Sequence, residues 1–319
     1  MKTIFITGMA GMIGFHTAKK FHELGWNVTG LDNFNDYYDP KLKQAREAML
    51  NGLGIDVINA DIQNPDEYEE LIKNADVVLH LAAYANPRHS FEEPQHYIDT
   101  NITGTQRILE VAEQYDTPVV YASSSCVMHG QPLPWNEHDR PAHQNNAYGW
   151  SKRSNECQFM HSKLSRSTGL RFFTVYGPYG RPDMALFKFT DAILEDNALT
   201  IYNFGDMKRD FTYVDDIVQG VVIVTDDILK PAKTSDGVCH EIYNIGYGEQ
   251  VQLMDFVHEI EKNLDRKGRY DMVPAHPADT PETWADTTKL EALGYKPTTP
   301  VSKGVKEFIS WYKEYYNVN

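Results

Sequence analysis

The stretch "KTIFITGMAGMIG", residues 2–14, joins a short apolar strand pattern to three glycines and the start of a helix pattern. Gly8, Gly11 and Gly14 are spaced G-x-x-G-x-x-G at the expected strand-to-helix turn. Glycines let a backbone approach a ligand closely, and the N–H groups of a helix N-terminus attract phosphate. The stretch therefore predicts a dinucleotide-binding turn, in which Met12 and Ile13 are further cofactor-binding positions.

Short β-branched runs alternate with amphipathic helix patterns over the first half of the chain. Beyond the first strand, the expected strands are 27–32, 54–61, 75–83, 117–125 and 169–177, and helix patterns include 12–25, 65–74 and 101–115. Strands that are apolar on both faces and separated by helices predict a parallel sheet covered on both sides. We expect a doubly wound α/β (Rossmann) domain over residues 1–175.

An acidic residue follows the second expected strand. Asp32 stands 24 residues after Gly8, where a carboxylate accepts hydrogen bonds from a ribose diol. It would repel the 2′-phosphate of NADP, and no Arg occurs in the adjoining "LDNFNDYY", so NAD is the favoured cofactor. Asp61 and Ile62, at the end of the third strand, are expected to border the adenine, although Asp61 also fits an ordinary strand end.

The strand and helix alternation breaks after about residue 176 into loops rich in Gly, Pro, Asp and aromatic residues. We expect a smaller α/β lobe over residues 176–319, ending in a helix at 301–316, with a ligand cleft between the lobes. The segment from about 211 to 245 contains a strand and helix pattern that can pack back on the first lobe.

Composition excludes several classes of protein. The net charge of −15 argues against a nucleic-acid partner, because phosphate backbones need a basic face. No apolar run approaches the roughly 20 residues of a membrane span. Three cysteines without C-x-x-C spacing suggest neither a disulfide framework nor a metal site, and they fit a reducing cytoplasm best.

The segment "NNAYGWSKRSNE", residues 145–156, places Tyr148 and Lys152 four positions apart. On a helix this spacing puts both side chains on one face. A phenol has a pKa of about 10, and a neighbouring ammonium favours its phenolate form, so the pair can act as a general base. The spacing alone does not distinguish such a pair from two solvated side chains.

The glycine turn, Asp32, "HLAA" (80–83), "YASSS" (121–125), Tyr148-x-x-x-Lys152 and "RFFTVYGPYGRPDMALFKF" (171–189) follow one another in an order that resembles the extended short-chain dehydrogenase/reductases. Within them the chain is most similar to the UDP-glucuronate 4-epimerases, on "LDNFNDYYD", "LRFFTVYGPYGRPDMALFKF", "RDFTYVDDIV" and "YNIG". The resemblance implies C4 epimerisation of a UDP-hexuronate with bound NAD through a 4-keto intermediate. It also implies a homodimer formed through helices near 96–115 and 146–165.

The resemblance further implies roles for single residues. Tyr148, Lys152 and a strand-end hydroxyl would be catalytic, with Ser124 the best candidate and Ser125 next to it. The implied substrate contacts are Arg209 for the diphosphate, Asp279 for the uridine ribose, Lys188 for the uracil, Thr174 and Arg181 for the hexuronate carboxylate, and Arg88 as a second cation. Arg181 can instead brace the loop between the lobes through Asp183.

The segment "SSSCVMHG", residues 123–130, departs from the family pattern, since Met128 and His129 stand where relatives usually have tyrosine and glycine. A sugar 4,6-dehydratase is disfavoured because Cys126 and Val127 occur where that family has an Asp-Glu pair. Alternatives are a UDP-glucose or UDP-N-acetylhexosamine 4-epimerase, a UDP-glucuronate decarboxylase and, less favoured, an NAD-sensing regulator without enzymatic activity.

Overall fold

The computed structural model describes residues 1–139, 141–231 and 239–318. In this part of the chain, a central sheet of seven parallel strands has the order β11-β6-β5-β4-β1-β2-β3. The strands are β1 (Thr3–Thr7), β2 (Asn27–Asp32), β3 (Val57–Asn59), β4 (Val77–His80), β5 (Val119–Ser124), β6 (Arg166–Phe172) and β11 (Cys239–Ile245). The order reverses between β1 and β4, and doubly wound sheets bind ligands at the carboxyl ends of such strands.

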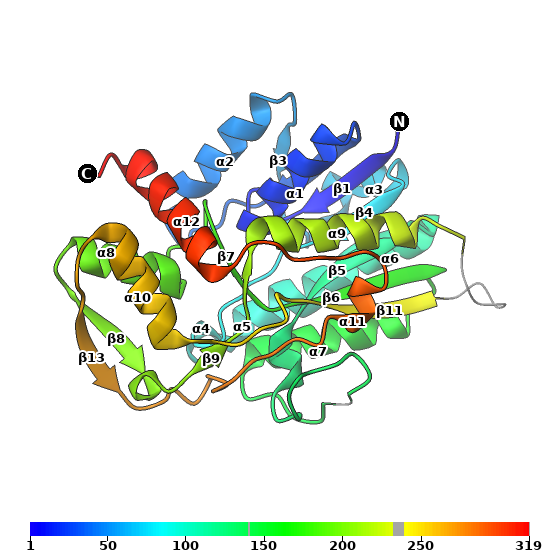
Figure 1. Ribbon diagram of the computed structural model, residues 1–319. Coiled ribbons are helices and arrows are strands. Elements are labelled where there is room, and N and C mark those ends of the chain that lie inside the picture. The colour runs from blue at the N-terminus through cyan, green and yellow to red at the C-terminus, as the bar shows by residue number, and fades with distance from the viewer. Residues whose placement is uncertain (140, 232–238, 319) are drawn as a thin grey trace.

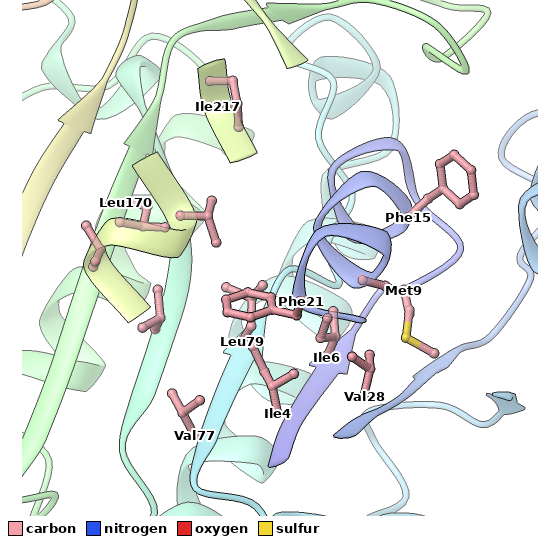
Figure 2. Packing of buried hydrophobic residues seen from close by; sticks show 14 of the residues in the cluster. Ile4, Ile6, Met9, Phe15, Phe21, Val28, Val77, Leu79, Leu170 and Ile217 are labelled. Atoms are coloured by element: carbon pink, nitrogen blue, oxygen red, sulfur yellow. The ribbon is translucent and has the colours of Figure 1, made fainter. Parts of the chain in front are cut away.

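Helices cover both faces of this sheet (Figure 1). One face carries α1 (Met12–Glu23), α2 (Lys41–Asn51) and α9 (Val214–Ile228), and the other carries α3 (Glu69–Lys73), α6 (Thr105–Tyr115) and α7 (Ala147–Met160). Successive side chains of a strand point to opposite faces, so Ile4 and Ile6 pack toward α1 whereas Phe5 packs toward α6. Figure 2 shows Ile4, Ile6 and Phe21 in the first of these two core layers.

A second lobe lies beside the carboxyl ends of the strands (Figure 1). It contains α8 (Ala185–Leu194), α10 (Leu253–Leu264) and α12 (Val301–Tyr316), with the strand pairs β7 (Thr174–Tyr176) and β10 (Phe211–Tyr213), β8 (Ala198–Tyr202) and β13 (Arg269–Val273), and β9 (Lys208–Arg209) and β12 (Val251–Gln252). Met12 and Leu42 of the first lobe join the hydrophobic core of this lobe. The two lobes therefore share buried apolar surface.

Short elements complete the described chain: η1 (Pro65–Glu67), α4 (His89–Glu92), α5 (Pro94–His96), η2 (Tyr97–Gly104), η3 (Ser125–Met128), η4 (Asn203–Gly205) and α11 (Thr288–Glu291). No helix among the described residues is both long enough and apolar enough to cross a bilayer. In the same residues, no group of three or more His, Cys, Asp or Glu side chains is arranged to hold a metal ion.

The doubly wound α/β prediction is confirmed, but several elements differ locally. The strands predicted at 54–61 and 75–83 are shorter in the structure, as β3 and β4. The helix predicted at 65–74 divides into η1 and α3, the strand predicted at 169–177 divides into β6 and β7 at Phe173, and the helix predicted at 101–115 begins as the π-helical turn η2. In the segment from 211 to 245, α9 packs against α1 and β11 pairs with β6, while residues 232–238 lie outside the described residues. The division of the chain at residue 175 stays a prediction.

Candidate active site between the two lobes

A cavity of about 920 Å³ opens at the carboxyl ends of the central strands. Its walls come from both lobes. The first lobe contributes the turn after β1, the segments that follow β4 and β5, and the first turns of α7, while the second lobe contributes α8, β8 and the segment 278–283. The strand order predicts a ligand at this edge, and the cavity has the size of a cofactor or substrate site.

The glycine turn lines this cavity with Gly8, Gly11, Met12, Ile13 and Gly14. Gly8 has a φ of +69°, and a β carbon at Gly14 would lie 2.3 Å from the carbonyl oxygen of Gly8. At Gly8 and Gly14 there is therefore no room for a side chain, and the turn brings bare backbone to the cavity. Because α1 begins at Met12 without a side-chain cap, its first N–H groups remain available to an anion. This arrangement fits the pyrophosphate of a dinucleotide.

Asp32, predicted to bind the cofactor ribose, lies buried at the end of β2 and is paired with a lysine that the sequence reasoning missed. Lys43 Nζ lies 3.1 Å from Asp32 Oδ1, and the Phe34 N–H donates to the same oxygen at 2.9 Å. A signal was present, because Lys43 stands in the first turn of the helix that follows this strand. Lys43 offsets the negative charge of Asp32. The pair therefore repels the 2′-phosphate of NADP less strongly than an unpaired Asp32 would.

Asp32, Asp61 and Ile62 are not among the residues that line the cavity. Asp61 accepts hydrogen bonds from Asn33 Nδ2 at 2.8 Å and from the Gln63 N–H at 2.9 Å. The Ile62 side chain is buried in the hydrophobic cluster on the α6 face of the sheet. Only the backbone of Ile62 is therefore left to border a ligand.

The predicted catalytic tyrosine stands at the second position of α7. Asn146 caps this helix by accepting the Gly149 N–H at 2.7 Å, which fixes where α7 begins. Lys152 lies one turn further along, and both side chains line the cavity, with Tyr148 9% and Lys152 2% exposed. Lys152 Nζ donates to the carbonyl oxygen of Ala122 at 2.9 Å. The helix thus holds the predicted pair at the wall of the cavity.

The protonation of this pair in the protein alone differs from the expectation that Lys152 lowers the pKa of the phenol. Burial raises the pKa of Tyr148 well above its usual value, although a hydrogen bond with Ser124 and the charge of Arg181 act in the opposite direction. Burial also lowers the pKa of Lys152 to about 7. At neutral pH the phenol is therefore protonated and the lysine is about half charged, so base catalysis needs further positive charge in the cavity.

The three strand-end serines have separate environments. Ser123 Oγ donates to Glu156 Oε1 at 2.7 Å, and that carboxylate is also bound by Arg171 at 2.8 Å, so Ser123 belongs to a buried structural network. Ser124 Oγ accepts the Cys126 N–H at 3.2 Å, and of the three serines it is the one that lowers the pKa of the Tyr148 phenol. Ser125 lines the cavity beside it. Ser124 is thus better placed than Ser125 to share an oxygen with Tyr148.

The unusual residues after these serines pack locally. Met128 is buried, and its Sδ accepts from Arg171 Nη1 at 2.9 Å. His129 Nδ1 lies 3.1 Å from Thr280 Oγ1 and so connects the segment to the second lobe. Cys126 lines the cavity, and its charge would influence the Tyr148 phenol. Met128 and His129, which depart from the family pattern, are not among the residues that line the cavity, whereas Cys126 is.

Arg209 is the predicted diphosphate ligand and lines the cavity. Its Nη1 donates to the carbonyl oxygens of Lys208 at 3.0 Å and Pro281 at 2.8 Å, so these bonds aim the guanidinium without neutralising it. Burial lowers its pKa. Lys188, exposed on α8, and Thr174, at the start of β7, also line the cavity.

Arg181 braces the loop between the lobes through Asp183, as in the second of the two roles considered for it. Its Nε and Nη2 donate to the two oxygens of Asp183 at 2.9 and 2.6 Å, and its Nη1 donates to the carbonyl oxygen of Ala85 at 3.0 Å. Tyr37 Oη and Asn86 Nδ2 donate to the same carboxylate at 2.9 and 2.8 Å. Burial opposes ionisation of Asp183, but Arg181 holds the pKa of this carboxyl far below its usual range. The network joins the second-lobe loop to the first lobe at the cavity wall.

Arg88 and Asp279, predicted as separate substrate contacts, bind each other across the lobes. Arg88 Nε and Nη2 donate to the two Asp279 oxygens at 3.1 and 2.8 Å. The Arg88 guanidinium also stacks 3.6 Å from the ring centroid of Tyr202. All three residues line the cavity, so the pair remains next to any ligand, but its charges are already balanced.

Comparison with known proteins identifies relatives over almost the whole chain. The model of the NAD dependent epimerase/dehydratase family matches residues 4–246. Protein CapI of Staphylococcus aureus is 40% identical, covering 98% of this chain and 99% of that protein. A probable UDP-glucuronate 4-epimerase of Rhizobium meliloti is 37% identical, with 98% and 97% covered. A crystal structure of UDP-glucuronic acid 4-epimerase from Bacillus cereus, in complex with UDP-glucuronic acid and NAD, superimposes with a TM-score of 0.88, at 32% identity and 98% and 100% coverage.

Proposed function

The chain belongs to the NAD dependent epimerase/dehydratase family, and we propose that it epimerises UDP-glucuronate to UDP-galacturonate at C4 with NAD as cofactor. The observation that carries this proposal is the 37% identity, over 98% of the chain, to a relative named as a probable UDP-glucuronate 4-epimerase. The cavity supports it with a backbone turn for a pyrophosphate next to a buried tyrosine and lysine.

NAD, when bound, supplies the hydride acceptor and donor for C4 of the sugar. The glycine turn and the N-terminus of α1 hold its pyrophosphate, and Asp32 with Lys43 holds its adenine ribose. Tyr148 Oη takes the proton of the sugar 4-hydroxyl and later returns it, while Ser124 hydrogen-bonds the same sugar oxygen. Lys152 places positive charge beside the phenolate. Because the sugar gains back what it loses, no net oxidation occurs.

Second-lobe residues hold the UDP-hexuronate in this proposal. The guanidinium of Arg209 binds the diphosphate, since its planar fork suits two phosphate oxygens. Lys188 borders the uracil, and the pair of Asp279 with Arg88 borders the uridine ribose. Thr174, Ser125 and Arg181 face the hexuronate carboxylate. Arg181 still has donors for it, because its hydrogen bonds to Asp183 and Ala85 use three of about five N–H groups.

The test is to incubate the purified protein with UDP-glucuronate, UDP-glucose and the two UDP-N-acetylhexosamines, without added NAD, and to follow the products by NMR. We expect UDP-galacturonate from UDP-glucuronate, and no turnover by Tyr148→Phe. Conversion of the neutral sugars alone would refute the uronate assignment. A UDP-pentose product would instead identify a decarboxylase, because the 4-keto uronate is a β-keto acid. Retained biological function of Tyr148→Phe would indicate a regulator.

We also propose a homodimer in the cytoplasm. Trp150 is 45% exposed on α7, and Cys157 lies two turns further along the same helix face and is also exposed. An exposed tryptophan on a helix face favours an interface between two copies. Sedimentation should give a dimer, and Trp150→Glu should shift it toward monomer. Reduced thiols at Cys126 and Cys157 fit the proposed compartment.

A further inference from the structure

Arg46 on α2 is a buried cation that has no carboxylate partner among the residues that the structure describes. The side chain is 0% exposed. Nη1 donates to the carbonyl oxygen of Ala10 at 2.7 Å and to Tyr38 Oη at 2.9 Å, and Nη2 donates to the carbonyl oxygen of Tyr179 at 2.6 Å. Within the described residues Nε has no hydrogen-bond partner. An uncompensated charge in a protein interior is costly, so this cation calls for an anion that the polypeptide does not itself supply.

The two carbonyl acceptors belong to the two loops that build the candidate site. Ala10 lies in the glycine turn, between Gly8 and Gly11, and is not itself among the residues that line the cavity. Tyr179 stands two residues before Arg181, in the loop that carries the brace to Asp183. Arg46 itself is not among the residues that line the cavity. One guanidinium outside the cavity lining therefore connects the glycine turn to the loop that carries Arg181.

The loop end of this connection is conformationally strained. Tyr179 has a φ of 57°, a left-handed backbone conformation that a bulky residue seldom adopts. Such a conformation persists only where the surroundings hold it in place. The Tyr179 ring packs 5.1 Å from Phe15 and 4.9 Å from Trp311, between ring centroids, and Arg46 binds its carbonyl oxygen. Loss of that bond would leave Tyr179 itself held by the packing of its ring, although Arg181 would still brace the loop.

We propose that Arg46 is a positioning residue with two effects: its charge serves as a fixed counter-charge for the dinucleotide pyrophosphate, and its fork ties the glycine turn to the loop that carries Arg181. The inference rests on the proposed function, because it takes the ligand of the turn to be a dinucleotide and the ligand of the loop to be a hexuronate. It predicts that cofactor binding and uronate binding depend on the same side chain, although Arg46 contacts neither ligand.

The charge and the fork can be separated by substitution. Arg46→Met keeps an apolar side chain but loses the positive charge and the forked set of donors. Arg46→Lys keeps the positive charge but cannot bind two carbonyl oxygens in the planar fork geometry. Tyr38→Phe removes only the phenolic partner, and Lys41→Met removes an exposed charge from the same helix. Each variant is made in the Tyr148→Phe protein, which binds without turnover, and its folding is checked by circular dichroism.

Calorimetry gives the Kd for NAD, and then the Kd for UDP-glucuronate at saturating NAD. We expect Arg46→Met to raise the Kd for NAD roughly 10- to 100-fold, which is the range for losing one nearby charge in a medium of intermediate dielectric constant. The same variant should raise the Kd for UDP-glucuronate about 10-fold. Arg46→Lys should recover NAD binding to within about 3-fold while UDP-glucuronate binding stays weak, and both control variants should match the parent.

Two results would overturn the inference: folded Arg46→Met protein that binds NAD as the parent does, or Arg46→Lys protein that loses NAD binding as severely as Arg46→Met. If Arg46→Met does not fold, the split between the two ligands in Arg46→Lys decides the question alone. The NAD measurement needs no sugar. A failed uronate assignment would therefore show as absent UDP-glucuronate binding in the parent, and the role of Arg46 at the cofactor turn would be judged separately.

Discussion

Replacing Lys152 by Met should make the NAD-free protein more stable at low pH, although it removes a residue that we propose to be catalytic. Lys152 is 2% exposed, and its polar contact is the Ala122 carbonyl oxygen. Burial lowers its pKa from 10.5 to about 7. A base with a lowered folded-state pKa binds fewer protons when folded than when unfolded across this window. Stability of the wild type is therefore lost as the pH falls from 10.5 to about 7, and the full penalty applies below pH 7.

The size of the effect follows from the shift. A difference of about 3.5 pKa units corresponds to about 5 kcal/mol at roughly 1.36 kcal/mol per unit. Met fills nearly the same volume without a charge but gives up one hydrogen bond, which contributes about 1 kcal/mol, and leaves a carbonyl unsatisfied at a cost of about 1 kcal/mol. We expect Lys152→Met to be about 3 kcal/mol more stable than the wild type at pH 6. The advantage should shrink steadily above pH 7.

The assay is urea unfolding of protein stripped of NAD, with wild type and Lys152→Met compared at pH 6, 8 and 9.5. Lys163→Met, which removes an exposed lysine just beyond the end of α7, is the matched control and should differ from wild type by less than about 0.5 kcal/mol at every pH. If Lys152→Met were the less stable protein at pH 6, or if its advantage did not change with pH, then Lys152 would not be a desolvated ammonium and the reasoning would fail.

Three further outcomes are expected at the site. Ser124→Ala should lower kcat about 100-fold without loss of stability, whereas Ser123→Ala should leave kcat within a few-fold and cost about 1–3 kcal/mol in urea unfolding, because it removes a partner from a buried carboxylate; equal kinetic losses would mean that the wrong serine has been chosen. Arg209→Lys should raise KM for the UDP-sugar about 10-fold with kcat little changed, since an ammonium lacks the planar fork, and a loss confined to kcat would argue against diphosphate binding. Bound UDP-glucuronate should protect Cys126, which lines the cavity, from alkylation followed by mass spectrometry while exposed Cys157 reacts unchanged; equal labelling with and without ligand would place the thiol away from the sugar.

Local sequence patterns predicted most of the fold because they report properties of one segment at a time. The apolar run 27–32 and the helix at 301–316 have the predicted bounds, and the glycine turn is where strand and helix patterns meet. The π-helical turn at 97–104 was missed, since Gly104 there lies against Ile62 from a distant segment. A β carbon at Gly104 would come within 2.6 Å of that side chain. Tertiary packing, and not local preference, determines this element.

Most of the residues that the sequence predicted for the site line the cavity, but the sequence did not predict how their side chains pair. Tyr148, Lys152 and Ser124 come together because a helix face and a strand end are local features. The pair of Arg88 with Asp279 joins residues 191 positions apart, and the sequence contains no signal for that partner choice. Assigning such side chains to a substrate from family position alone overlooks that the empty protein must first satisfy their charges.

The cations around the cavity divide by the kind of partner they have. Lys43 and Arg181 bind carboxylates, so their charges are balanced inside the polypeptide. Lys152, Arg46 and Arg209 donate to backbone carbonyls, which orient a cation without neutralising it. A chain with a net charge of −15 thus keeps unbalanced positive charge at its interior cavity. NAD and a UDP-sugar each contain a diphosphate, whose negative charge offsets this positive charge. Binding of either ligand should therefore increase the free energy of unfolding of the protein.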